Sequence, residues 1–180
     1  MLGARSASPQ GREVIATTTT APAAAGQLDE RELRAWRGLL RVHASLYKAL
    51  DAQLEAEHGL PLTSYEVLKY LGEAQQHRMR MCDLASSVIL SRSGLTRLVD
   101  RMEREGLLVR ESCASDARGA FAKLTPAGQE KLAAARSTHL ACVRSLFLAH
   151  LGEDELELLA EVWDRVLPGA TRAARIDCSC

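Results

Sequence analysis

Apolar side chains recur at helical spacing over most of the chain. Between Leu33 and Leu54 they fall three or four residues apart, which predicts a long helix from about Glu30 to Glu57. Asp29 can cap its first turn, and His58-Gly59 followed by Pro61 marks its end. The same spacing predicts five further helices, with starts near Thr63, Met79, Ser91, Thr125 and Asp154.

Polar and glycine residues mark the ends of these predicted helices. Thr63 and Glu66 form a T-x-x-E pattern, which is typical of a capping box. Ser91 is expected to cap a helix that Gly106 ends. Thr125-Pro126 places a cap before a proline at the first helical position, and this helix is expected to reach about Leu151. The last helix is expected to end near Val166.

Two short runs break the helical pattern. Residues 107–112 and 119–124 are predicted strands, and residues 113–118 are their connecting loop. Before them come a short helix from Met79 to about Ser87, an apolar turn at residues 88–90, and the helix that Ser91 caps. We therefore predict a mostly α fold with a small β-hairpin wing, in the order of a winged helix-turn-helix.

The helix after Ser91 has two different faces. Leu95, Leu98, Val99 and Met102 share one face and are predicted to be buried. The opposite face is predicted to point outward, and it carries hydroxyls and arginines: Arg92, Ser93, Thr96, Arg97, Asp100 and Arg101. Hydroxyls can donate to phosphates, and arginine can bind guanine with two hydrogen bonds in the major groove. This pattern favours binding to double-stranded DNA.

Charge is unevenly distributed, although the whole chain carries no formal net charge. Residues 78–123 hold nine Lys and Arg against six Asp and Glu, a balance of +3. A positive subregion is expected of a nucleic-acid contact surface, although an excess this small is equally typical of a solvated face. If the region binds DNA, so small an excess predicts binding that depends on sequence and is still sensitive to salt.

Composition excludes several classes of protein. No apolar run approaches the ~18 residues of a membrane span, and the start lacks a secretory core, so a cytoplasmic location away from membranes is expected. Five irregularly spaced cysteines do not form a disulfide framework. The chain shows no catalytic or phosphate-binding motif and no paired histidine spacing. We therefore predict no enzyme activity, no cofactor and no metal site.

The region from Leu84 to Gly128 resembles the MarR family of bacterial winged helix-turn-helix transcription regulators. The marks are the run SRSGLTR at residues 91–97, Asp100-Arg101, Gly106-Leu107, Asp116-x-Arg118 and Leu124-Thr125-x-x-Gly128. The likeness continues less sharply from Trp36 to about Val166. The resemblance implies a sequence-specific DNA-binding regulator, and we expect a repressor that a small aromatic or phenolic ligand releases.

The resemblance also assigns parts of the chain. It implies a wing whose Arg118 enters the DNA minor groove, with Asp116 holding the guanidinium in position. It implies a homodimer that binds a near-palindromic operator. The expected organisation is an N-terminal arm without fixed structure (1–27), a dimerisation helix (28–60), a DNA-binding domain (61–125), C-terminal dimerisation helices (126–168) and a flexible tail (169–180). The expected DNA contacts are Ser91, Arg92, Ser93, Thr96, Arg97, Arg101, Asp116 and Arg118.

The resemblance places an effector pocket where the dimer helices meet the winged domain. Residues that could line it are Trp36, Arg37, His43, Tyr47 and Tyr65, although ordinary core or dimer contacts would also explain them. Two alternatives stay open: a regulator of the same fold that senses thiol oxidation, and a winged-helix protein-interaction module without an operator. For Cys82 we expect packing as a small apolar group, and for Cys113 an exposed position in the wing.

Overall fold

The computed structural model describes residues 26–171, except for Ile89 and residues 114–115, and it describes the backbone alone at Arg92, residue 113 and residues 116–119. Two compact units divide between Leu39 and Leu40. Helix α1 (Glu30–His58) begins in the first unit and ends in the second. Within the described ranges, no helix combines the length and the apolar character needed to span a membrane.

The first unit contains the start of α1, and its cap is the one that the sequence predicts. The backbone N–H of Glu32 donates to Asp29 Oδ1 over 2.8 Å, and the backbone N–H of Asp29 donates to Glu32 Oε2 over 2.7 Å. These reciprocal bonds satisfy two donors that a helix start leaves free. The prediction of a helix start near Glu30 is therefore confirmed.

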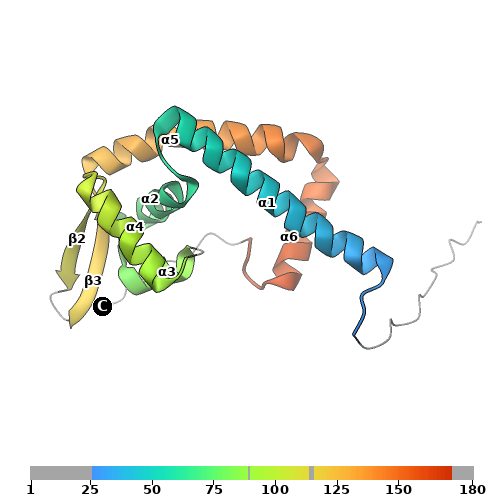
Figure 1. The fold of residues 1–180 in the computed structure, drawn as a ribbon, viewed down its shortest axis with the longest axis horizontal. Helices are drawn as coiled ribbons and strands as arrows, with labels where there is room; N and C mark the ends of the chain where they lie inside the picture. Colours follow the sequence, from blue (N-terminus) through green and yellow to red (C-terminus); the bar gives the residue numbers. More distant parts are fainter. Residues whose placement is uncertain (1–25, 89, 114–115, 172–180) are drawn as a thin grey trace, which may run out of the picture. The chain divides into compact units, whose positions relative to one another are not determined.

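The second unit contains the other elements in the order of a winged helix. After α1 come α2 (Leu62–Glu73), a short 3₁₀ turn η1 (Gln75–His77), β1 (Arg78–Arg80), α3 (Met81–Ser87) and α4 (Arg92–Arg104). The strands β2 (Leu108–Cys113) and β3 (Asp116–Leu124) follow, and then α5 (Pro126–Leu146), the 3₁₀ turn η2 (Leu148–His150) and α6 (Glu153–Val166). Figure 1 shows α2 in the middle of the group formed by α3, α4 and α5.

The core of this unit forms around α2. Four residues of α4, Leu95, Leu98, Val99 and Met102, are buried in one cluster with apolar residues of α2, α3 and the sheet. All four lie on the face that the sequence predicts to be buried. Because the cluster includes residues of every α-helix and strand from α2 to β3, it fixes α4 against the rest of the winged domain.

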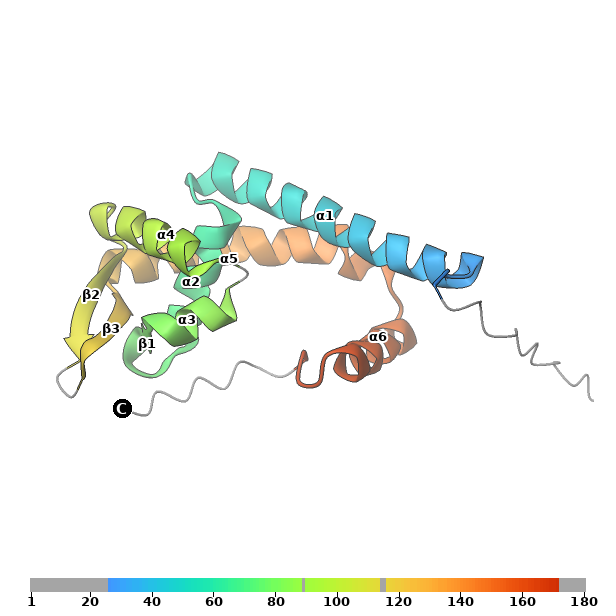
Figure 2. The ribbon, with the colours of Figure 1, turned by 60° about the horizontal axis from the view of Figure 1, so that its bottom comes forward.

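A three-stranded antiparallel sheet flanks these helices, in the order β1-β3-β2. Leu108 pairs with Leu124 at one end of the β2–β3 ladder, and the register shifts between Ser112 and Cys113. The β2–β3 hairpin extends beyond the helices in both views (Figures 1 and 2). The mostly helical fold with a small β-hairpin wing is thus confirmed.

Some predicted boundaries are wrong. Residues 78–80 form a strand paired with β3, where the sequence analysis expects a helix from Met79, because Met79 is buried between two half-buried arginines in the alternating pattern of a strand. The hairpin loop is shorter than predicted, and Asp116 and Arg118 belong to β3. Helix α5 ends at Leu146, before the predicted Leu151, and a 3₁₀ turn follows.

The predicted capping box of α2 is also wrong. The helix begins at Leu62 with Pro61 at the cap position, and no side chain of that turn caps it. Asp51 of α1 accepts a hydrogen bond from the backbone N–H of Leu62 over 2.8 Å instead. A carboxylate is well suited to a helix N-terminus, where free N–H groups and the helix dipole favour negative charge.

The end of α4 and the start of α5 are joined through Thr125. Its backbone N–H donates to Leu107 O over 3.2 Å, and its hydroxyl donates to Gly106 O over 2.6 Å. The same hydroxyl caps α5 by accepting a hydrogen bond from Gly128 N–H over 3.1 Å. Gly106 has a φ of +73°, a conformation that favours glycine. A Cβ on Gly128 would lie 2.0 Å from Leu107 O, so the backbones of the two segments approach closely at this point.

We predict that Gly128→Ala destabilises the protein by about 1–3 kcal/mol, because the added methyl group would meet a backbone atom that cannot move aside. Gly72→Ala is the matched control. A Cβ there would lie 2.6 Å from Leu132 Cδ2, which is the end of a flexible side chain. Urea unfolding measures both changes, and equal losses in the two variants would contradict the backbone clash.

Candidate functional site

The N-terminal half of α4 presents polar side chains to solvent. Ser91 caps the helix by accepting a hydrogen bond from Gly94 N–H over 3.1 Å, and its hydroxyl lies 3.3 Å from the Ser93 hydroxyl. Ser93, Thr96 and Arg97 are exposed. Arg97 makes no hydrogen bond or ion pair with the described part of the chain. Among the described side chains, this end of α4 therefore presents to solvent the hydroxyl-bearing residues Ser93 and Thr96 and the guanidinium of Arg97.

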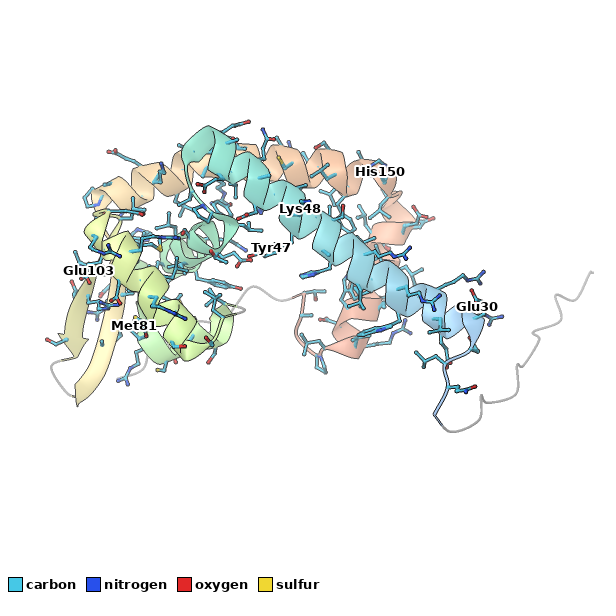
Figure 3. The ribbon with its side chains drawn as sticks, viewed as in Figure 1. Glu30, Tyr47, Lys48, Met81, Glu103 and His150 are labelled. Carbon is cyan, nitrogen blue, oxygen red and sulfur yellow. The ribbon has the colours of Figure 1, made fainter. Side chains whose placement is uncertain are left out.

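The sequence analysis expects the C-terminal half of the same face to point outward. In the structure, side chains of this half are bonded to the wing instead. Asp100 Oδ1 lies 2.6 Å from Arg110 Nη2, and Glu103 Oε2 lies 3.1 Å from Arg110 Nη1. Arg110 also donates its backbone N–H to Glu103 Oε1 over 2.9 Å. Figure 3 labels Glu103 on α4 beside the hairpin. These bonds join α4 to the first strand of the wing.

Arg101 stays partly exposed, with 43% of its side-chain surface open to solvent, but its guanidinium also binds within the protein. Its Nη2 donates to Ser64 Oγ of α2 over 2.9 Å, and its Nε lies 3.8 Å from Glu105 Oε1. Ser64 is the single buried polar residue in the described ranges, with 1% of its surface exposed. The Arg101 guanidinium is therefore directed partly into the protein.

Acidic neighbours and an aromatic ring engage several other cations of the positive region. Lys123 Nζ lies 3.0 Å from Glu111 Oε1, and Arg78 Nη1 lies 3.8 Å from Glu111 Oε2. The guanidiniums of Arg78 and Arg80 lie 5.0 Å and 5.6 Å from the centre of the Phe121 ring. The positive balance of residues 78–123 is therefore a poor measure of the charge offered to DNA, because much of it is paired within the sheet.

For the wing, the structure describes the course of the backbone. Cys113 pairs with Asp116 at the far end of the β2–β3 ladder, and Arg118 lies further along β3. The side chains of Arg92, Asp116 and Arg118 lie outside the described residues, as does the predicted pairing of Asp116 with Arg118. The backbone thus brings Arg118 close to the end of the hairpin, as a strand residue and not as a loop residue.

A cavity of about 210 Å³ lies between α2 and α5. The ring centres of Tyr65 and His139 stack 4.5 Å apart in its wall. Two cations, one acid and apolar groups complete the lining: Lys69, Arg136, Glu73, Gly72, Leu132 and Leu140. With two cations against one carboxylate, the cavity is suited to a small anion that carries a ring.

Burial shifts the titration of both stacked rings. Desolvation raises the pKa of the Tyr65 hydroxyl, with nearby Arg136 opposing the rise and Glu73 adding to it. Desolvation lowers the pKa of His139, and the charge of Lys69 lowers it further. The Nδ1 atom of His139 is buried and has no hydrogen-bond partner in the described ranges. Both groups therefore favour their neutral forms near pH 7.

The residues predicted to line an effector pocket do not come together around this cavity. Tyr65 is the one member of the predicted set that lines it. The rings of His43 and Tyr47 lie 6.2 Å apart on α1, and Figure 3 labels Tyr47 there. Burial raises the pKa of half-buried Glu66 on α2, while Lys69 and His43 oppose the rise. Trp36 and Arg37 are exposed residues of the first unit.

The described cysteines form no disulfide. Cys82 is exposed, and its thiol donates to Asp83 Oδ1 over 3.4 Å, so the expected packing as a small apolar group is wrong. It lies on the outer side of α3, because Leu84 is the residue of that helix that enters the core. Cys142 is half-buried on α5. No group of three metal-binding side chains occurs in the described residues.

The chain is similar to solved regulators along most of its length. It is 37% identical to AbsC, a MarR family transcriptional regulator from Streptomyces coelicolor, covering 78% of this chain and 94% of AbsC with a TM-score of 0.74. A model of the MarR family matches residues 60–119. The chain belongs to the MarR family of transcriptional regulators.

Two further relatives cover different shares of this MarR-family protein. Sco3205 from Streptomyces coelicolor, whose structure was solved in complex with DNA, is 32% identical, covering 84% of this chain and 94% of Sco3205 with a TM-score of 0.75. The uncharacterized HTH-type transcriptional regulator YkoM of Bacillus subtilis (strain 168) is 31% identical over 58% of this chain and 68% of YkoM. This MarR-family protein is thus a DNA-binding transcriptional regulator.

Several residues of the site were not predicted from the sequence. The cavity residues Lys69, Glu73, Arg136 and His139 lie more than 60 positions apart in two groups, and helical spacing gives no indication that the groups meet. The contact of Arg110 with Asp100 and Glu103 also spans two elements. The sequence does contain one signal for this contact. Arg110 comes shortly after a helix that carries Asp100 and Glu103, and such a spacing favours an ion pair across the turn between helix and strand.

Proposed function

We propose that the chain is a homodimeric repressor whose α4 enters the major groove and whose operator affinity falls when a small aromatic or phenolic acid binds. The observation that carries the proposal is the exposed guanidinium of Arg97, which has no partner in the described part of the chain and lies on the same helix face as Ser93 and Thr96. The opposite face of α4 is held in the core, so this edge is fixed in direction. The DNA complex of Sco3205, a relative 32% identical, supports such a use of the domain.

The proposed contacts have separate roles. Ser91, Arg92 and Ser93 lie at the N-terminus of α4, where backbone N–H groups and hydroxyls suit a phosphate. Thr96 and Arg97 follow one turn later and are proposed to contact base edges. Arg118 is proposed to enter the minor groove from the wing, with Asp116 orienting it. A cytoplasmic location is part of this proposal, since the DNA that is bound lies there.

Exposed apolar faces support the homodimer. Of the 29 residues of α1, Leu54 is the buried one, while Trp36 and Leu40 are about half exposed. Helix α6 has no buried residue, and Leu158 and Val166 are 56% and 71% exposed. Large apolar surfaces on two amphipathic helices mark an interface. A two-fold dimer would place its α4 helices about one DNA turn apart, which requires an operator with two inverted half-sites.

The cavity between α2 and α5 supports control by a ligand. Its 210 Å³ is smaller than the ~300–1,000 Å³ of pockets for drug-sized ligands, which limits the occupant to about one ring. Lys69 and Arg136 favour a carboxylate or phenolate, and the stacked rings favour an aromatic group. A ligand that separates α2 from α5 would move α4, because α4 packs against α2.

The two other hypotheses are less well supported. Membership in a family of DNA-binding regulators favours an operator over a protein-interaction module. Control by thiol oxidation would require a reactive cysteine near the DNA contacts. Cys82 is exposed on α3, and the side chain of Cys113 lies outside the described residues. An operator affinity that falls on treatment with mild peroxide, and that falls less in Cys113→Ser, would favour this hypothesis.

For DNA binding, we predict that Arg97→Ala loses about 1–3 kcal/mol of discrimination between the operator and a duplex with a substituted guanine, because a bidentate contact would be removed. Arg104→Ala is the control, since it removes an equal charge from the exposed C-terminal turn of α4. The operator is first recovered from genomic DNA by the purified protein. Fluorescence anisotropy then gives both affinities, and a loss that is uniform over all sequences would instead indicate a phosphate contact.

For the dimer, we predict that light scattering of the wild type gives twice the mass of one chain. The double variant Leu40→Glu with Leu158→Glu is expected to have the mass of a single chain. A carboxylate on each apolar face would have to be buried without a partner, which costs several kcal/mol. Val109→Glu on β2 is the control, because Val109 is 41% exposed and lies on neither helix. A wild-type protein that stays monomeric at all concentrations would exclude the proposed dimer.

For the ligand, we predict that 2-hydroxybenzoate weakens operator binding and that Arg136→Gln reduces the ligand affinity by about tenfold, the size of a charge-assisted hydrogen bond. Arg144→Gln removes a charge from an exposed position of α5 outside the cavity and should retain the wild-type ligand affinity. Calorimetry measures the affinities. An equal effect of both substitutions, or a ligand that binds without changing operator affinity, would contradict control through this cavity.

A further inference from the structure

The bond between Arg101 and Ser64 crosses from the DNA-binding helix to the centre of the domain. Arg101 is one turn along α4 from Arg97, and resemblance alone would count it among the DNA contacts. Its Nη2 instead donates to Ser64 Oγ over 2.9 Å. Ser64 is buried, so its hydroxyl needs a partner within the protein.

Two groups of the protein contact the guanidinium of Arg101. Glu105, one turn further along α4, lies 3.8 Å from Arg101 Nε. Ser64 lies on α2, whose backbone at that residue is fixed by a hydrogen bond from Ser64 N–H to Pro61 O over 2.9 Å. The hydrogen bond to buried Ser64 orients the guanidinium, while the exposed Glu105 pair at 3.8 Å contributes little to holding it. The contact therefore constrains the angle between α4 and α2.

We propose that Arg101 is a positioning residue for DNA binding, which sets the orientation of α4 through Ser64 and makes no contact with DNA of its own. The inference rests on the proposed function, in which α4 enters the major groove. Arg110 restrains α4 from the side of the wing through Asp100 and Glu103. Arg101 restrains it from the side of α2, so the two arginines together fix the helix that carries Arg97.

The position of Ser64 gives this bond a regulatory consequence. The next residue, Tyr65, lines the cavity between α2 and α5 and stacks on His139. Ser64 and Tyr65 lie in the first turn of α2, so a shift of that turn would move both the cavity wall and the anchor of Arg101. An occupant of the cavity would in this way change the orientation of α4 without touching it.

The test compares Ser64→Ala, Arg101→Ala and the double variant in the full-length protein. Operator affinity is measured by anisotropy at several salt concentrations. Each single substitution is expected to raise the dissociation constant by about tenfold, equivalent to the loss of one charge-assisted hydrogen bond, and the double variant by no more than either alone. The slope of log affinity against log salt should stay at the wild-type value in all three, because no phosphate contact is lost.

A direct contact of Arg101 with a DNA phosphate would give a different result. If Arg101 bound a phosphate, Arg101→Ala would reduce the salt slope by about one for each chain in the complex, and Ser64→Ala would bind DNA as the wild type does. Wild-type affinity in both single variants, or losses that add in the double variant, would also overturn the inference. A wild-type protein that fails to retain any DNA would instead overturn the proposed function.

Two further variants separate positioning from a loss of stability. Ala135→Gly creates a small defect at a buried position of α5, and it should lower the unfolding midpoint while leaving operator affinity unchanged. Arg101→Lys keeps the charge but cannot reach Ser64 and Glu105 together, so it is expected to bind DNA weakly with an unchanged salt slope. Near wild-type affinity in Arg101→Lys would favour a phosphate contact, and this variant serves even if Ser64→Ala does not fold.

Discussion

The burial of one face of α4 is the constraint on which the rest of this domain depends. Leu95, Leu98, Val99 and Met102 enter the core, and helical geometry then turns Ser93, Thr96 and Arg97 to solvent. A helix that is held along its length by four apolar side chains cannot rotate without exposing them. Polar contacts at Arg101 and Arg110 add direction to this hold, since each joins α4 to one neighbouring element.

Helix α2 connects the parts of the protein that the proposed function uses. Asp51 of α1 caps its first residue, Ser64 accepts from Arg101 of α4, and Tyr65 stacks on His139 of α5. These three contacts lie within the first turn of one helix. A small displacement of that turn would therefore change its contacts with α1, α4 and α5 together. Control of DNA binding by a ligand requires such a connection between the ligand site and the DNA-binding helix.

The long helices follow a different physical rule from that of the winged domain. The winged domain buries its apolar residues within one chain, whereas α1 and α6 leave theirs largely exposed. Such helices gain little stability from packing within their own chain, and the proposed dimer would cover their apolar residues. In the proposed function, this division separates the winged domain, which would bind DNA, from the helices that would form the dimer.

The sequence by itself determined the helices, the buried face of α4, the caps at Asp29, Ser91 and Thr125, and the family, because each depends on residues close together in the chain. Tertiary structure decided what depends on distant residues. The pairing with β3 made residues 78–80 a strand, and Asp51 took over the cap expected from Thr63. The bond between Arg101 and Ser64 also depends on tertiary structure, because helical periodicity gives the side of a helix from which a side chain starts and not the group on another helix that it reaches.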